Sequence, residues 1–239
     1  MKEKFDKYVS NYDLSNPNIE LKYNHSLRVM DLSEKYAQKL GFNEEEIWLA
    51  SVIGLLHDLG RFEQLRVYHT YDDYHSIDHA DYSVEQLFDK QLIRYFIPST
   101  RKYDEIIKQA IQNHNKREIS GVTDEMTMKF CYFIRDMDKL DIYYNMAILG
   151  GIKTETDNVP LSNKVLEAIR KRETVNTNDR KVKNDFVATI LAFVFDIHYD
   201  ILLLQVKQYI EIIYNKLENQ SYFEEVKQII QQYIEERMR

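Results

Sequence analysis

The 239-residue chain is poor in the residues that build turns and covalent cross-links. It has 6 glycines and 3 prolines, far below average usage, which argues against a turn-rich β protein. Its single cysteine, Cys131, excludes an internal disulfide and a four-thiolate zinc site, so we expect a reducing, cytoplasmic environment. No uncharged run approaches the roughly 18 residues of a membrane span. The start of the chain is charged and has no apolar segment, so we expect no signal peptide.

The charge balance limits the class of partner. The formal net charge is −7, whereas an extended nucleic-acid surface needs a basic face. We therefore expect a small-molecule partner, no extended nucleic-acid surface and no membrane association, and the oligomeric state stays open. The length favours one domain spanning residues 1–239.

The apolar residues recur with a helical period along almost the whole chain, so we expect an all-α fold. The first clear stripe contains Leu21, His25, Val29 and Leu32 at spacings of three or four residues. Asn43 and Glu46 predict a capping box at the start of an apolar helix that ends at His57 and Asp58. Inside that helix, Gly54 indicates the close approach of another backbone. The regular pattern breaks between Gly60 and Asp78, where residues 61–65 are compatible with a helical turn and residues 68–77 are predicted to form a polar, aromatic loop. The later helices are expected near residues 161–172, 183–217 and 221–237.

Imidazoles and carboxylates occur on the inward faces of these helices. His57 and Asp58 are adjacent, and neighbouring helical side chains point about 100° apart. Both can therefore reach one metal ion only if the helix ends there or a second ion is shared. Four more residues of the same chemistry lie on separate helical segments: His25, His79, His114 and Asp138.

Each of these residues also has a structural interpretation. A single histidine on an apolar helix face is often a hydrogen-bonded core residue. Asp138 would be costly to bury alone, and Arg135, Arg28 or Lys139 is available as an ion-pair partner. However, four histidines and two aspartates on inward faces would each need a separate explanation, so together they favour a metal site.

The order of these residues resembles the HD superfamily of metal-dependent phosphohydrolases. That family has a first histidine, a His-Asp pair and a distant aspartate. The matching positions are His25 in Asn24–Val29, the pair in Leu56–Arg61, and Asp138 in Asp136–Asp141. Asp138 is preferred to Asp136 and Asp141 because it matches the Asp-Lys-Leu of the family and falls on the inward stripe. The resemblance implies an HD-type helical bundle over about residues 20–145, with C-terminal helices over about 160–237.

Two further histidines match HD proteins that hold two metal ions. His79 and His114 lie between the pair and the last aspartate. The resemblance then implies one ion on His25, His57, Asp58 and Asp138, with Asp58 bridging to a second ion on His79 and His114. One or two divalent transition-metal ions are expected, and four imidazoles favour Fe, Mn, Ni, Co or Zn over Mg.

This site predicts hydrolysis of a phosphate ester of a small metabolite or nucleotide by a metal-activated water. Asp58 is expected to act in catalysis through the metal centre, and Arg61 and Arg28 are candidate phosphate contacts. For Arg61 the alternative is an ion pair with Glu63 or Asp58, and for Arg28 a pair with one of the many carboxylates.

His69 and His75 are either proton donors or solvated loop residues, and Asp72, Asp73 and Asp78 either orient ligands or form turns and caps. Two other functions stay open: a di-iron oxygenase of the same fold, and a non-catalytic binding module.

Overall fold

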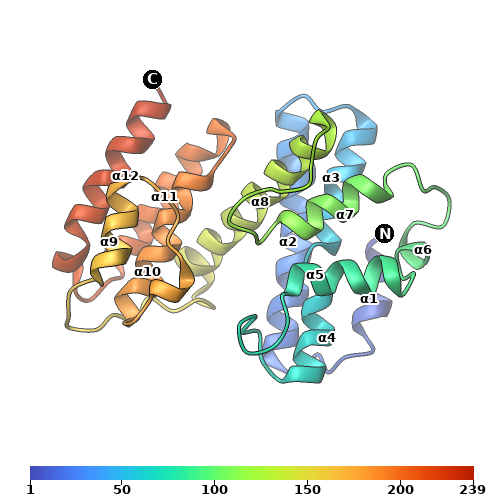
Figure 1. The fold of residues 1–239 in the computed structure, drawn as a ribbon, viewed down its shortest axis with the longest axis horizontal. Coiled ribbons are helices and arrows are strands. Elements are labelled where there is room, and N and C mark those ends of the chain that lie inside the picture. Colours follow the sequence, from blue (N-terminus) through green and yellow to red (C-terminus); the bar gives the residue numbers. More distant parts are fainter. The chain divides into compact units, whose positions relative to one another are not determined.

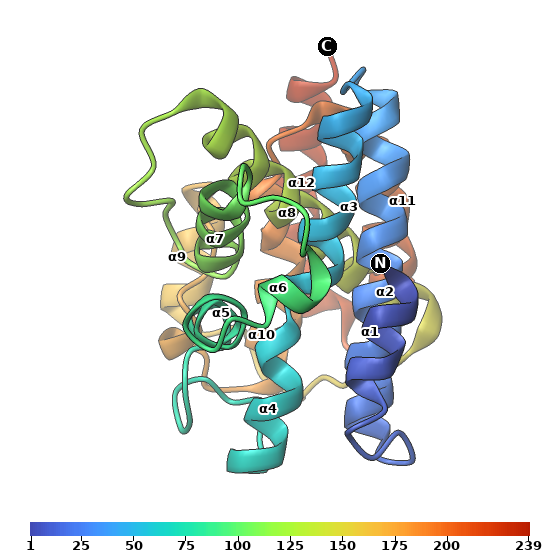
Figure 2. The ribbon, with the colours of Figure 1, turned by 90° about the vertical axis from the view of Figure 1, so that its right-hand side faces the viewer.

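The computed structural model describes all 239 residues, and every regular element in it is helical, as the sequence predicted. The chain divides into two compact units, Met1–Asp138 and Lys139–Arg239, which are described separately (Figures 1 and 2). None of the helices is both long enough and apolar enough to cross a membrane.

The first unit contains the elements that carry the predicted ligands. In chain order these helices are α1 (Lys2–Val9), α2 (Pro17–Lys39), α3 (Glu44–Leu56), α4 (Leu59–Tyr68), α5 (His79–Val84), α6 (Ile93–Phe96), α7 (Asp104–Asn113) and α8 (Glu125–Tyr144), with a π-helical turn at Glu85–Asp89. Helix α8 begins in this unit and ends in the next.

Helices α2 and α3 pack so closely that one position between them must be glycine. A Cβ atom on Gly54 would lie 2.6 Å from Ser33 Oγ and 2.9 Å from the Val29 carbonyl oxygen. The predicted capping box of α3 is present, with the Asn43 side chain and Glu46 bonding each other's backbone N–H. The prediction that another backbone approaches Gly54 is therefore confirmed, and α2 carries His25 past the end of α3.

A second glycine contact joins α4 to α5. A Cβ atom on Gly60 would lie 2.5 Å from the Ser83 backbone nitrogen, and the Gly60 N–H donates to Ser83 Oγ at 2.9 Å. The Ser83 hydroxyl in turn donates to the His79 carbonyl oxygen at 2.8 Å. This contact sets the separation between the helix after Asp58 and the helix that begins at His79.

The helical turn considered for residues 61–65 is part of a longer helix in the structure, and the loop predicted over 68–77 begins at residue 69. Residues 59–68 form α4, which ends where His69 adopts a left-handed conformation with φ of 58°. The helix forms because Phe62 and Leu65 bury their side chains in the core. The loop proper spans residues 69–78, and Asp78 caps α5 by accepting from the Ala80 and Asp81 backbone N–H groups.

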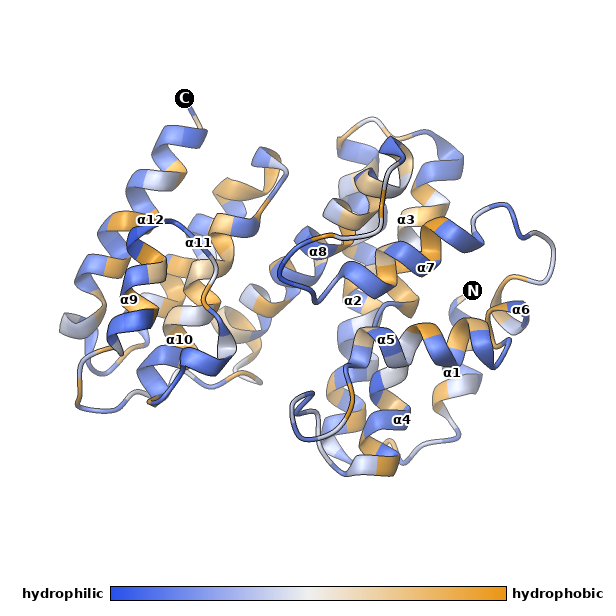
Figure 3. Cartoon of the chain, viewed as in Figure 1, coloured by the Kyte–Doolittle hydropathy of each residue, from blue (hydrophilic) through white to orange (hydrophobic).

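The second unit is also a helical bundle. Its α-helices are α9 (Asn163–Arg170), α10 (Lys183–Leu191), α11 (Leu203–Asn215) and α12 (Glu224–Arg237), preceded by a π-helical turn at Asn145–Leu149. Figure 3 shows apolar and polar stripes alternating along α9 and α12. Val165, Ile169, Val226 and Ile230 are buried in its core.

The single helix predicted over 183–217 is wrong. After α10 the chain forms a 3₁₀ turn (Ala192–Asp196), passes through extended residues and re-forms at a second 3₁₀ turn (Asp200–Leu202) before α11. Arg237 donates to the carbonyl oxygens of Ile197 and His198 and so replaces helical hydrogen bonds there. Because this residue lies some forty positions later in the chain, local periodicity could not predict the break.

Candidate metal centre

The six predicted ligands lie where helices end or face one another in the first unit. His25 is in the middle of α2, His57 ends α3, and Asp58 occupies the break between α3 and α4. The remaining three are the first residue of α5, the residue that ends α7, and a residue of α8: His79, His114 and Asp138. The end of α3 explains how adjacent side chains can point into one site.

Four of these side chains form a first cluster. His25 Nε2 lies 3.2 Å from His57 Nε2, 3.2 Å from Asp138 Oδ1 and 3.5 Å from Asp58 Oδ2. His57 Nε2 is 3.7 Å from Asp58 Oδ2 and 3.8 Å from Asp138 Oδ1. The Asp138 carboxylate therefore lies beside both imidazoles.

The second cluster forms around the other oxygen of Asp58. His79 Nε2 lies 3.1 Å from His114 Nε2 and 3.5 Å from Asp58 Oδ1, and His114 Nε2 lies 3.7 Å from the same oxygen. The ligand atoms of Asp58, His79 and His114 all lie within 4.8 Å of one another, as do those of His25, His57 and Asp58. Asp58 thus presents one carboxylate oxygen to each cluster.

In three of the imidazole rings, the nitrogen that points away from the cluster makes a hydrogen bond. This bond determines which ring nitrogen carries the proton and which carries the lone pair that faces the cluster. His57 Nδ1 donates to the Gly54 carbonyl oxygen at 2.8 Å, and His114 Nδ1 donates to the Ile111 carbonyl oxygen at 2.6 Å. A carbonyl can only accept, so Nδ1 carries the proton and Nε2 of the neutral ring carries a lone pair. His79 Nδ1 donates to the Asp73 carboxylate, with the same result.

This donor set fits metal ions. Lone pairs on His79 and His114 face each other at 3.1 Å and would repel without a cation between them. Two nitrogens bound to one ion at about 2.0–2.1 Å are about 2.9–3.4 Å apart at octahedral to tetrahedral angles. Asp58 Oδ1 is also buried without a hydrogen-bond partner, which is costly for a carboxylate unless a cation binds it.

The electrostatics favour the protonation states that bind metal. Burial lowers the pKa of His57, and burial and then the Arg61 charge lower the pKa of His79 to about 4. Burial alone would raise the pKa of Asp58, but Lys22 and then His57 hold it well below its ordinary value. At neutral pH His57 and His79 are therefore neutral imidazoles and Asp58 is an ionised carboxylate, the forms that coordinate metals.

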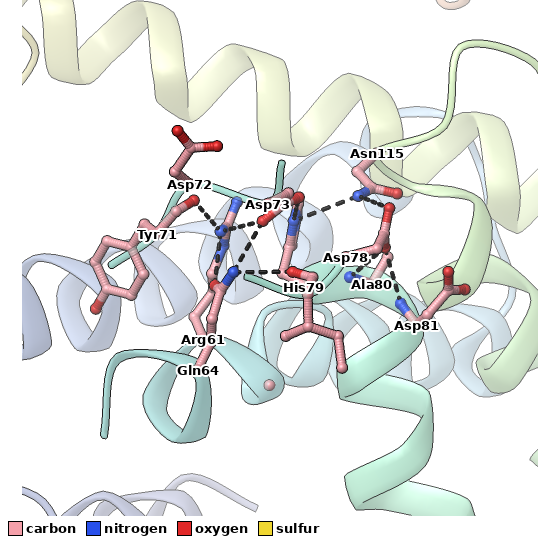
Figure 4. A network of polar contacts seen from close by, with 12 residues as sticks. Arg61, Gln64, Tyr71, Asp72, Asp73, Asp78, His79, Ala80, Asp81 and Asn115 are labelled. Atoms are coloured by element: carbon pink, nitrogen blue, oxygen red, sulfur yellow. Dashed lines mark hydrogen bonds and ion pairs between the residues drawn. The ribbon is translucent and has the colours of Figure 1, made fainter. Parts of the chain in front are cut away.

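The Asp73 carboxylate, in the 69–78 loop, connects His79 of the second cluster to Arg61. Asp73 accepts from His79 Nδ1 through one oxygen, while its other oxygen lies 2.7 Å from an Arg61 terminal nitrogen (Figure 4). A carboxylate on the outer nitrogen of a ligating histidine fixes its tautomer and orientation. Of the three aspartates considered for this role, only Asp73 makes this bond to His79. Asp72 pairs with His75, and Asp78 caps α5.

Arg61 lies against Asp58 but is held mainly by the loop. One terminal nitrogen donates to Gln64, to the Tyr71 carbonyl oxygen and to Asp73 at 2.7–2.8 Å, and Nε lies 3.7 Å from Asp58 Oδ1. Glu63, the other acid considered as its partner, pairs with Arg66.

The other predicted contacts lie in less direct positions. Arg28 is half-buried on α2, one turn after His25. His69 and His75 are exposed, which agrees with their interpretation as solvated loop residues.

Lys22 was not among the site residues predicted from the sequence. Its ammonium lies 2.6 Å from Asp58 Oδ2. Lys22 precedes His25 by three residues and so shares its helix face. The sequence signal that could have identified Lys22 is its position one helical turn before the candidate ligand His25.

Comparison with known proteins identifies the family. The model of the HD domain matches residues 23–143, just over half of the chain, and this range includes all six predicted ligands. No curated protein and no solved structure matches the chain. The family match and the clustered histidines and aspartates lead to the same conclusion: the chain belongs to the HD domain family, within the superfamily of metal-dependent phosphohydrolases.

Proposed function

We propose that this protein hydrolyses a phosphate ester of a small metabolite or nucleotide with the help of two divalent transition-metal ions. The observation that carries the proposal is the position of Asp58, whose two oxygens face separate groups of imidazoles. A buried carboxylate shared in this way suits a pair of ions better than one ion or an ordinary ion pair.

The residues divide between two ion sites. His25, His57 and Asp138 would hold the first ion with Asp58 Oδ2, and His79 and His114 would hold the second with Asp58 Oδ1. When bound, such ions lower the pKa of coordinated water to about 7 and stabilise charge on a phosphoryl group. The imidazole-rich set supports Fe, Mn, Co, Ni or Zn over Mg.

The chain's own residues orient the site and supply positive charge. Carbonyl oxygens of Gly54 and Ile111 hold two imidazoles in their ligating tautomer, and Asp73 holds a third. Arg61, whose side chain is 12 % exposed, lies beside Asp58 and supports the binding of an anionic substrate. The sequence has no Gly-x-Ser-x-Gly or P-loop motif that would suggest a different hydrolytic or nucleotide-binding site.

The test combines metal analysis with a substrate screen. Purified protein is analysed for bound metals, reloaded with each of Fe, Mn, Co, Ni and Zn, and assayed against panels of phosphate monoesters and diesters. Asp58→Asn serves as the matched inactive variant, because it keeps the side-chain shape but removes the bridging charge. We expect hydrolysis by the loaded protein and none by Asp58→Asn.

Two results would contradict the proposal. Oxygen consumption by the iron-loaded protein, without phosphoester hydrolysis, would identify an oxygenase. Metal-loaded protein that is inert to both panels and to oxygen would indicate a binding module.

A further inference from the structure

The ammonium group of Lys22 has hydrogen-bonding capacity that its one acceptor does not use. It has three donors, and its hydrogen bond goes to Asp58 Oδ2 at 2.6 Å. The side chain is 19 % exposed, and Asp58 is its only protein acceptor. Because Asp58 Oδ2 also faces His25 and His57, the remaining donors lie at the edge of the first cluster.

Arg61 has unused donors on the opposite side of the same carboxylate. One of its two terminal nitrogens makes the contacts with the loop. Its Nε is buried without a hydrogen-bond partner and lies 3.7 Å from Asp58 Oδ1. The Nε edge of a guanidinium is one of the forks that bind two oxygens of a phosphate at once. Lys22 and Arg61 therefore flank Asp58, one beside each oxygen.

The aromatic ring of Tyr71 keeps these two cations in place. The Lys22 ammonium lies 5.9 Å and the Arg61 guanidinium 5.5 Å from its centroid, within the range of a cation–π attraction. The Tyr71 hydroxyl donates to the Asn18 carbonyl oxygen at 2.9 Å, which ties the loop to the first turn of α2. Two like charges are thus held near each other around one buried carboxylate, an arrangement that an additional anion stabilises.

We propose that Lys22 and the Nε edge of Arg61 bind the phosphate group of the substrate, and that this group is a phosphate monoester. The inference rests on the proposed function and specifies its substrate class. A monoester has three non-bridging oxygens and two negative charges, whereas a diester has two oxygens and one charge. Two side-chain cations in addition to a metal centre match the monoester, because each cation then has an oxygen to contact.

The experiment compares Lys22→Gln with wild type, with Lys22→Arg and with Lys35→Gln. Glutamine can still donate to Asp58 but has no charge, and Lys35 is an exposed lysine on the same helix. Each protein is loaded with Mn²⁺, its metal content is measured, and binding of inorganic phosphate is followed by calorimetry. Activity is measured with 4-nitrophenyl phosphate and with bis(4-nitrophenyl) phosphate.

We expect Lys22→Gln to weaken phosphate binding by about ten- to hundredfold, and to lower kcat/KM for the monoester by a similar factor mainly through KM. Metal affinity should be unchanged or higher, since a competing positive charge has been removed. Lys22→Arg should retain part of the binding, and Lys35→Gln should match wild type. The monoester should be the better substrate of the wild-type protein.

The outcomes separate this inference from the proposed function. Wild-type protein that hydrolyses phosphoesters while Lys22→Gln binds phosphate normally would overturn only the role of Lys22. Preference for the diester would overturn the substrate class. Loss of metal from both Lys22→Gln and Lys22→Arg would show that Lys22 serves the metal centre instead. Wild-type protein that neither binds phosphate nor hydrolyses either ester would overturn the proposed function and this inference together.

Discussion

Gly60→Ala should weaken the second ion site while leaving the first largely intact. The new Cβ would lie 2.5 Å from the Ser83 nitrogen and 2.9 Å from both Ser83 Oγ and the Tyr82 carbonyl carbon. Ordinary contacts are about 3.5–4.0 Å, so α4 and α5 must separate by roughly 1 Å. Since α5 begins at His79 and α4 follows Asp58, the displacement falls between two residues of the second cluster.

The effect of Gly60→Ala on the free energy of unfolding combines a loss from overpacking with a gain in helix propensity. Overpacking of this kind costs about 1–3 kcal/mol, whereas replacing glycine by alanine in a helix gains about 0.5–1 kcal/mol. The net loss of about 0–2.5 kcal/mol corresponds to a melting temperature lowered by up to about 10 °C, measured with a chelator present. In metal titrations, we expect wild type to bind two ions and Gly60→Ala to bind the second at least about tenfold more weakly.

Gly54→Ala is the matched control, because its new Cβ would separate α2 from α3. The contacts at 2.6 Å to Ser33 Oγ and 2.9 Å to the Val29 carbonyl oxygen lie on the side of His25 and His57. This variant should weaken the first ion site. The reasoning is refuted if both variants lose both ions equally, or if either keeps two tightly bound ions despite a lowered melting temperature.

Further substitutions test the assignment of individual residues. Asp58→Ala should abolish metal binding but leave the far-ultraviolet circular dichroism of a helical protein; full metal content would contradict its bridging position. His79→Ala or His114→Ala should reduce bound metal from two ions to one, and a wild-type protein that never exceeds one ion would refute the two-metal assignment. Asp73→Asn should weaken the second ion about 10- to 100-fold in calorimetric titrations, since it removes the carboxylate that orients His79; an unchanged affinity would show that the loop does not support the ligand. Arg61→Ala should lower kcat/KM for a phosphate ester about ten- to hundredfold at constant metal content, with partial recovery in Arg61→Lys; normal kinetics with a lowered melting temperature would make Arg61 structural.

The sequence predicted the candidate centre better than it predicted its surroundings. Helical faces and helix ends are local properties, so the spacing placed His25 on an inward face and the pair at 57–58 at a helix end, and the resemblance to the HD superfamily implied that these residues are ligands. Gly54 was informative for the same reason, since a glycine inside an apolar helix needs a packing explanation.

The missed features depend on contacts between distant parts of the chain. Lys22 has many exposed counterparts in the sequence, and only the folded chain brings it to Asp58, 36 residues away. Arg237 interrupts a long apolar pattern by bonding carbonyl oxygens 39 and 40 residues earlier. Periodicity carries no information about either pairing, because each depends on tertiary structure.

The bond between Asp73 and His79 would make the two proposed ion sites thermodynamically unequal. His57 is oriented by a carbonyl within its own helix, whereas His79 depends on a carboxylate from the 69–78 loop. Because the second ion binds when the loop is ordered, any change that stabilises the ordered loop also strengthens binding of that ion. Each 1.4 kcal/mol of such stabilisation raises the affinity tenfold. Filling of the second site should accordingly slow amide hydrogen exchange and proteolysis in the loop around the exposed Tyr74, so that protection of this segment reports how much of the protein holds both ions.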